Sequence, residues 1–216
     1  MLYTSAMKLI LIGGTYEGEY SLNYVASEIA RADPSYDVSV YSYAFAMRHR
    51  DEINKVINGN FLVTHSAGAM VLERGAHPAK AVLVSPSQPI PRPQMAIRAL
   101  VKTFVHTWRT FTRGDRMKTF RILVSNIGEF FLRPISNAMP FLRGDISRFD
   151  LRDVLPKHPA AGSTKIILSS RDELIRPHEN IMDELEEHGV EIVHLDAMHD
   201  EIFIDTELFI KEILKR

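Results

Sequence analysis

The sequence predicts an α/β fold: a doubly wound, mostly parallel six-stranded sheet with a helical cap inserted after the fourth strand. Short continuous apolar runs alternate with amphipathic segments, which is typical of parallel strands covered by helices on both faces. About eighty residues separate the fourth apolar run from the fifth, far more than an ordinary crossover needs. The sheet and the insertion are therefore predicted as two parts of one domain of 216 residues.

Each apolar run predicts a strand, and the amphipathic segment that follows it predicts a helix. Gly13-Gly14 and Asp33-Pro34 mark the ends of the first strand and of the first helix. The expected strands are 7–12, 37–44, 61–64, 81–85, 165–169 and 191–195. The expected helices of the core are 21–31, 48–58, 67–74, 179–188 and 206–214.

Residues 90–149 are predicted to form the helical cap, and residues 1–89 and 150–216 the core. Apolar side chains recur at helical spacing within the cap and indicate two amphipathic helices in a hairpin. They are Ile97, Val101, Phe104, Trp108 and Phe111, followed by Met117, Phe120, Val124, Ile127 and Phe131. Packing explains most of this stripe, and Trp108 is also a candidate substrate contact. The hairpin would lie above the carboxyl ends of the strands, where open α/β sheets bind ligands.

Composition excludes several classes of protein. A net charge of −1 argues against a dedicated nucleic-acid binder, and the lack of cysteine excludes disulfides, thiolate metal sites and a cysteine nucleophile. The apolar run after Lys8 is too short for a signal peptide, and no stretch has the length of a membrane span. We expect a soluble, cytoplasmic protein.

Ser66 falls in the turn between the strand at 61–64 and the helix predicted to begin at Ala67. Such a turn strains the serine backbone and exposes its hydroxyl at the carboxyl end of the sheet, beside free N–H groups. Thr64-x-Ser66-x-Gly68 is close to the G-x-S-x-G nucleophile elbow, with Thr64 in place of the first glycine. A serine that caps an ordinary helix gives a similar pattern, so other residues must decide between the two.

A nucleophilic serine needs a base to accept its proton and an acid to orient that base. Asp172 follows the fifth predicted strand, and His199 follows the sixth. Because parallel strands share one carboxyl edge, both residues are expected at the same edge as Ser66, in the order Ser, Asp, His along the chain. Asp196 and Asp200 flank His199 and are alternatives to Asp172, although neighbours in sequence rarely reach the ring from the correct side.

With these residues, the chain resembles the α/β-hydrolase superfamily, in particular carboxylesterases and lipases with a helical lid. Asp172-x-x-x-x-Pro177 is similar to the acid loop of that family, and the insertion to its lid. The resemblance implies Ser66 as nucleophile, His199 as general base and acid, and Asp172 as its orienting partner. It also implies a minimal version of the fold, because the family's first, antiparallel strands are missing, with a strand order of 2-1-3-4-5-6.

Stabilising the oxyanion of such a reaction requires two N–H donors. One would be Ala67, directly after the nucleophile, and the other would come from the loop after the first strand. Gly14 is preferred there because a residue without a side chain lets the substrate approach, and Thr15 is the alternative. Tyr16 and His65 are further candidates for substrate contact, although the His65 side chain is expected to point away from that of Ser66.

The same glycine-containing loop, residues 13–18, could instead bind a phosphate at the start of the helix. It fails both nucleotide fingerprints, because Thr15 stands where the dinucleotide pattern needs glycine and Glu19 where the P-loop needs lysine. Glu17 and Glu19 would also repel phosphate. No group of histidines and carboxylates has metal-ligand spacing, so no metal site is predicted.

We therefore expect a serine esterase that acts on a small-molecule ester or acyl substrate and needs no metal or organic cofactor. An acyltransferase or thioesterase with the same triad is the alternative, and a non-catalytic small-ligand-binding protein on the same fold is another. Residues 90–160 carry a net charge of about +8, while the rest of the chain carries about −9. This basic cap suggests peripheral contact with an anionic lipid, or a solvated face balanced by the acidic core.

Overall fold

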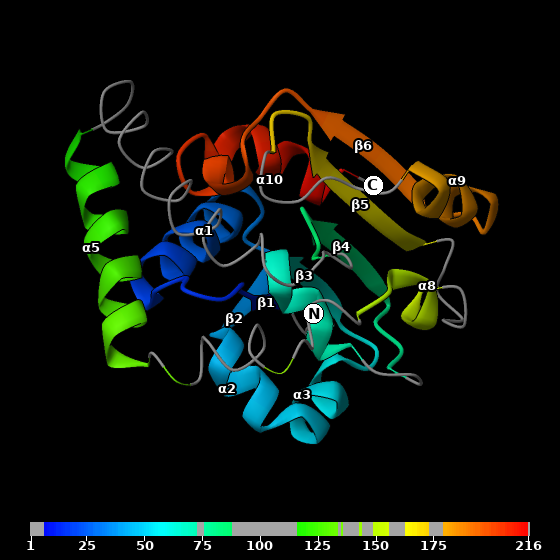
Figure 1. Ribbon diagram of the computed structural model, residues 1–216, viewed down its shortest axis with the longest axis horizontal. Helices are drawn as coiled ribbons and strands as arrows, with labels where there is room; N and C mark the ends of the chain where they lie inside the picture. The colour runs from blue at the N-terminus through cyan, green and yellow to red at the C-terminus, as the bar shows by residue number, and fades with distance from the viewer. Residues whose placement is uncertain are drawn as a thin grey trace, which may run out of the picture.

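The computed structural model describes residues 7–72, 76–87, 116–133, 135, 143, 149–155, 163–172 and 179–215. Its central feature is one six-stranded sheet in the order β2-β1-β3-β4-β5-β6, with every neighbouring pair parallel (Figure 1). The strands are β1 (Met7–Ile12), β2 (Tyr36–Tyr41), β3 (Phe61–His65), β4 (Lys80–Val84), β5 (Thr164–Ser169) and β6 (Glu191–Leu195). The predicted six-stranded α/β fold and the predicted strand order are confirmed.

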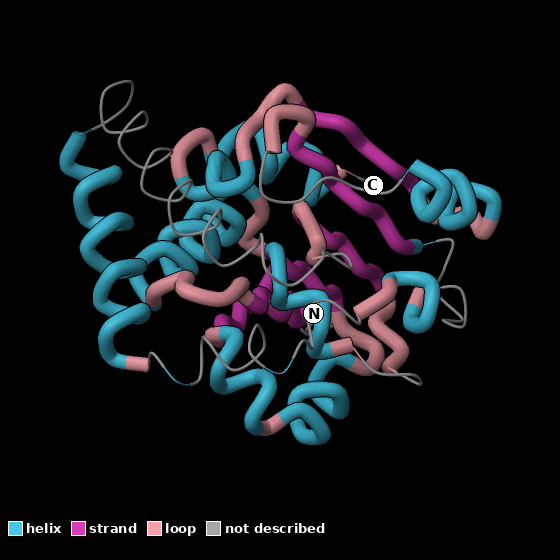
Figure 2. Tube along the Cα trace, in the orientation of Figure 1, coloured by secondary structure: helices cyan, strands magenta, loops and turns pink. Residues whose placement is uncertain are grey.

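Helices cover both faces of this sheet (Figure 2). The α-helices are α1 (Glu19–Ala32), α2 (Tyr43–Arg48), α3 (Arg50–Ile57), α5 (Arg116–Leu132), α8 (Leu151–Val154), α9 (Glu179–Glu187) and α10 (Thr206–Leu214). Two 3-10 helices, η1 (Ser66–Val71) and η3 (His199–Phe203), follow the carboxyl ends of β3 and β6.

The core has two halves, because successive side chains of a strand point to opposite faces. In β3, Leu62 packs with residues of α2, α3, α8 and α9 on one face. Phe61 and Val63 pack with residues of α1, α5, η3 and α10 on the other face. Fully buried aliphatic side chains fill both halves of the core. The sheet is therefore a rigid support for the loops at its carboxyl edge.

Among several small differences in element bounds, two predicted elements extend about three residues too far. The second strand ends at Tyr41 rather than at residue 44, because the Ser42 hydroxyl accepts a hydrogen bond from the Phe45 N–H and begins α2. The segment after β3 is a 3-10 helix that ends at Val71, not an α-helix that reaches residue 74. Side chains of α3 end it: Arg50 donates to the carbonyl oxygens of residues 71 and 72, and Asn54 to that of residue 71.

α5 lies between β4 and β5 in the sequence and agrees with the second predicted cap helix. It packs beside α1 (Figure 1), where the Asn126 Oδ1 accepts from the Gly18 N–H at 2.9 Å and from the Ser21 hydroxyl at 2.8 Å. The Lys118 ammonium donates to the carbonyl oxygen of Ile204 at 2.9 Å. α5 thus contacts the segments that follow the carboxyl ends of β1 and β6.

The first predicted cap helix, residues 97–111, lies outside the described residues, as do most of the basic side chains assigned to the cap. The cap boundaries at 90 and 149 and the contact with anionic lipid stay predictions. Among the described helices, none is both long and apolar enough to cross a membrane.

We predict opposite effects for alanine at two glycines. A Cβ on Gly68 would lie 2.6 Å from the Ile12 carbonyl oxygen, so Gly68→Ala should lower the free energy of unfolding by about 1–3 kcal/mol. Among the described residues, a Cβ on Gly128 in α5 would meet nothing within 4 Å, so Gly128→Ala should raise it by about 0.5–1 kcal/mol. Urea unfolding measures both. A Gly68→Ala protein as stable as the wild type would contradict the close approach of η1 to β1.

Candidate active site

Ser66 lies in the sharp turn between β3 and η1, and its backbone has a φ angle of 50°. A positive φ is strained for a residue with a side chain and persists only where the surrounding structure enforces it. Every other residue from Phe61 to Leu72 is buried, whereas Ser66 is partly exposed. The turn therefore presents a single accessible residue at the carboxyl end of a central strand.

Small residues let three segments meet around this turn. A Cβ on Gly14 would lie 2.8 Å from the Cβ of Ser66, so the loop after β1 can approach the serine only with glycine at this position. The Ser87 N–H donates a 3.1 Å hydrogen bond to the Ser66 carbonyl oxygen, which ties the segment after β4 to the same turn.

His199 and Asp172 lie beyond the carboxyl ends of β6 and β5, and a hydrogen bond joins their side chains. The Nδ1 of His199 is 2.6 Å from the Oδ2 of Asp172, and the two residues are only 5% and 6% exposed. A carboxylate at this place keeps the hydrogen on Nδ1, so the neutral ring carries its lone pair on Nε2. The structure thus brings together two of the three predicted catalytic residues.

Arg171 connects the loops that carry these two residues. Its guanidinium forms ion pairs with Asp196 at 2.9 Å and with Glu201 at 3.5 Å, and its backbone N–H donates to the Ala197 carbonyl oxygen at 3.0 Å. Asp196 is therefore engaged with Arg171. Of the two alternatives to Asp172, neither forms the hydrogen bond to the His199 ring that Asp172 forms.

Within the part of the chain that the structure describes, the Ser66 hydroxyl makes no hydrogen bond. Contacts between a nucleophile and its base are often long in ligand-free sites and shorten when substrate binds, so the role of Ser66 stays a prediction. The Ala67 N–H, the first expected oxyanion donor, stands at the start of η1, where N–H groups have no partner within the helix.

The Gly14 N–H, the preferred second donor, is already engaged. It donates a 2.7 Å hydrogen bond to the Oε2 of Glu17, which is only 5% exposed. Thr15, the alternative donor, is partly exposed. The geometry of the loop therefore favours Thr15 over Gly14 as the second donor. Sequence reasoning considered Glu17 only as a residue that repels phosphate and missed this contact.

The three predicted substrate contacts differ in their placement. His65 is 1% exposed, and both of its ring nitrogens have partners, so it lies behind the turn, as its strand position indicated. Tyr16 is partly exposed and has a φ of 68°, and burial raises the pKa of its hydroxyl. Trp108 lies outside the described residues.

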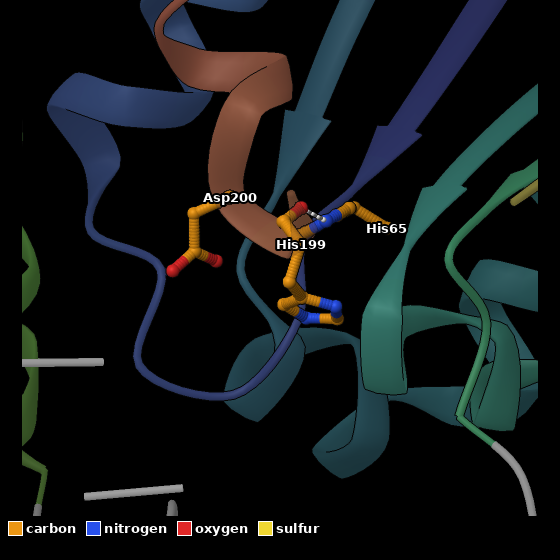
Figure 3. Close-up of side chains that lie close together, drawn as sticks. All are labelled: His65, His199 and Asp200. Atoms are coloured by element: carbon orange, nitrogen blue, oxygen red, sulfur yellow. Dashed lines mark hydrogen bonds between the residues drawn. The ribbon is translucent and has the colours of Figure 1, made fainter. Parts of the chain in front are cut away.

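One cluster has the composition of a metal site, but several of its ring nitrogens already form hydrogen bonds. His65, His199 and Asp200 each place a potential ligand atom within 4.8 Å of the others (Figure 3). The Nε2 of His65 contacts the His199 carbonyl oxygen, its Nδ1 contacts Glu17, and the Nδ1 of His199 contacts Asp172. A cation would have to displace these hydrogen bonds, so the arrangement does not favour metal binding.

Three carboxylates control the charge of His199. Burial lowers the pKa of the ring, but Asp172, Asp200 and Glu17 together raise it by more, to about 9 from an ordinary value of 6.5. Asp172 contributes through both its charge and its hydrogen bond. His199 is therefore mainly protonated at pH 7, and any reaction that needs it as a base accelerates as the pH rises toward 9.

Solved structures with the same fold cover almost the whole chain. The enol-lactonase from Burkholderia xenovorans LB400 has a TM-score of 0.64 at 15% identity, over 99% of this chain and 92% of that chain. An extracellular α/β-hydrolase from a Paenibacillus species has a TM-score of 0.59 at 13% identity, over 96% and 97%. The protein has the α/β-hydrolase fold.

A thioesterase domain from the curacin biosynthetic pathway shares this α/β-hydrolase fold, with a TM-score of 0.56 at 16% identity over 97% of this chain and 92% of that chain. No family model matches the chain, and no curated protein matches it.

In this α/β-hydrolase fold, Thr64 stands where the elbow pattern has its first glycine. Its hydroxyl is buried with no partner among the described residues, so the substitution adds an unpaired polar group beside the turn.

We predict that the His199 ring titrates far above an ordinary histidine. Its C2–H signal in a proton NMR titration should have a midpoint near pH 9, because the protonated ring faces three carboxylates. Asp172→Asn should lower this midpoint by removing one charge and a charge-assisted hydrogen bond. A His199 midpoint at or below 6.5 in the wild type would contradict the assigned electrostatics.

Proposed function

We propose that the protein is a serine hydrolase that cleaves a carboxylic ester through an acyl-enzyme on Ser66. The observation that carries the proposal is the turn at Ser66: a strained, partly exposed serine in an otherwise buried segment. Ordinary helix capping requires no positive φ at the serine, whereas presentation of a nucleophile does. The buried pair of His199 and Asp172 at the same sheet edge supplies the base and its orienting acid.

The proposed reaction follows from these positions. The Ser66 oxygen attacks the ester carbonyl carbon while the Nε2 of neutral His199 accepts the hydroxyl proton. Asp172 holds the ring in the required tautomer and stabilises the imidazolium. The imidazolium then gives its proton to the leaving alcohol, and the acyl group stays on Ser66. A water molecule, deprotonated by His199, attacks the acyl-enzyme. The acid leaves as the imidazolium returns the proton to the Ser66 oxygen, which restores the free serine.

Two backbone N–H groups would stabilise the negative oxygen that forms during each attack. Ala67 supplies the first from the start of η1, and the loop after β1 supplies the second. Since the Gly14 N–H is bonded to Glu17, we assign the second donor to Thr15. Each such donor contributes roughly a hundred- to a thousandfold in rate.

The proposed mechanism allows more than one leaving group and more than one acceptor of the acyl group. The solved neighbours include an enol-lactonase and a thioesterase domain. Both support acyl transfer as the class of reaction for this chain. A thioester substrate, or an alcohol in place of water as acceptor, would use the same three residues, so thioesterase and acyltransferase activities remain the alternatives.

A fluorophosphonate probe tests whether Ser66 is an activated nucleophile. Wild type and Ser66→Ala are incubated with the probe near pH 9 and read by intact mass and peptide mapping. Labelling at Ser66 that is lost in the variant supports the proposal. Unlabelled wild-type protein with an intact fold would indicate a non-catalytic ligand-binding protein. A panel of oxygen esters and thioesters then separates the alternatives.

Substitution of the triad should give unequal losses of turnover on a p-nitrophenyl ester. Ser66→Ala and His199→Ala should each lower kcat by about 10⁴–10⁶-fold, and the double variant should be no slower than either. Asp172→Asn should lower kcat by at least about 10²-fold, because an amide at this position can donate to Nδ1 and select the wrong tautomer of the ring. Asp196→Asn is the matched control and should keep nearly full activity. Full activity in Ser66→Ala or His199→Ala would refute the triad.

A further inference from the structure

Glu17 is a buried carboxylate that the proposed mechanism does not use. Its Oε2 accepts the hydrogen bond from the Gly14 N–H, and its Oε1 contacts the Nδ1 of His65. The other ring nitrogen of His65, Nε2, lies 3.0 Å from the carbonyl oxygen of His199 (Figure 3). A continuous chain of hydrogen bonds therefore connects the loop beside Ser66 to the main chain of the proposed base.

The direction of these hydrogen bonds follows from the chemistry of the groups. A carbonyl oxygen only accepts, so the Nε2 of His65 carries a hydrogen and donates it to His199. The Nδ1 of His65 contacts the Oε1 of Glu17, and Glu17 accepts from the Gly14 N–H through its Oε2, so these buried polar groups all have partners.

Gly13 and Gly14 lie close against the carboxyl group of Glu17. A Cβ on Gly14 would lie 2.6 Å from the Oε1 of Glu17, and a Cβ on Gly13 would lie 2.8 Å from its Oε2. The two glycines thus make room for the carboxyl group. The His65 ring is held on its other side by Phe203, at 5.3 Å between ring centroids in an edge-to-face arrangement.

We propose that Glu17 and His65 are positioning residues, which hold the main chain of His199 at a fixed place relative to the loop that approaches Ser66. This proposal rests on the proposed function, since it takes His199 as the base. A shift of either loop would move the base or the oxyanion donor away from the reacting carbonyl, and small displacements of such groups cost large factors in rate.

Glu17 also affects His199 through its charge. The His199 ring faces Asp172 from the loop after β5, Asp200 from η3, Glu17 from the loop after β1, and His65 from β3. Glu17 contributes to the raised pKa of His199 without touching its ring nitrogens. Two different substitutions of Glu17 can therefore separate its role in positioning His199 from the effect of its charge on His199.

Glu17→Gln removes the charge but can keep both contacts, because the amide oxygen can accept from Gly14 and the amide nitrogen can donate to His65. Glu17→Leu has a similar size and makes neither contact. His65→Phe keeps the ring beside Phe203 but loses both hydrogen bonds. Glu19→Gln, an exposed carboxylate two residues further along the chain, is the matched control for charge. Thermal unfolding establishes that each variant is folded.

Two readouts are measured against pH: the rate of fluorophosphonate labelling at Ser66 and the NMR midpoint of the His199 ring. Glu17→Gln should lower the midpoint by about 0.5–1 pH unit, shift the labelling profile with it, and keep the high-pH rate within about threefold. Glu17→Leu and His65→Phe should lower the high-pH rate at least about tenfold, and the double variant should be no worse, because the pair acts as a unit. Glu19→Gln should change neither readout.

Folded Glu17→Leu or His65→Phe protein that labels at the full high-pH rate would overturn the positioning role. A Glu17→Gln protein with the wild-type midpoint would overturn the charge effect. If the wild type is not labelled at all, the proposed function fails, while the NMR midpoints still test the contact between Glu17 and the His199 region. The two failures are thus distinguishable.

Discussion

The turn at Ser66 is the constraint on which the arrangement of the site depends. The chain must leave β3 and enter η1 within one residue, and the φ of 50° at Ser66 is the result. This is possible only because Gly68 lets η1 approach the end of β1 and Gly14 lets the next loop approach the serine. Side chains at either glycine would collide with their neighbours. The position of the Ser66 hydroxyl therefore depends on glycine at both places.

The sheet could be predicted because the apolar sequence pattern of its strands is local and strong. A parallel sheet buried on both faces requires continuous apolar runs, and Met7–Ile12 and Glu191–Leu195 were predicted to the residue. The second strand was overextended because Tyr43 and Ala44 continue its apolar run, while the capping contact that begins α2 depends on the geometry of Ser42. The length of η1 depends on side chains of α3, which no local pattern reveals.

The same distinction applies to the site. Asp172 and His199 could be paired from the sequence because strand order fixes which loops share an edge, and their 2.6 Å hydrogen bond agrees with that inference. The contact between Glu17 and His65 spans 48 residues and has no periodic pattern or known motif. A charged residue three positions after Gly14, with a histidine directly before the nucleophile, is the signal in the sequence that could have indicated it.

Because α5 contacts α1, replacing the segment between β4 and β5 with that of another protein would affect the start of α1. Gly18, which precedes α1, has no side-chain oxygen to cap its own helix, and the amide of Asn126 satisfies its N–H from 108 positions away. That N–H belongs to the residue directly after Glu17. A shortened or foreign insertion without an acceptor at this place would leave the start of α1 uncapped and loosen the loop beside Ser66. The segment between β4 and β5 and the loop beside Ser66 are therefore structurally coupled in this chain.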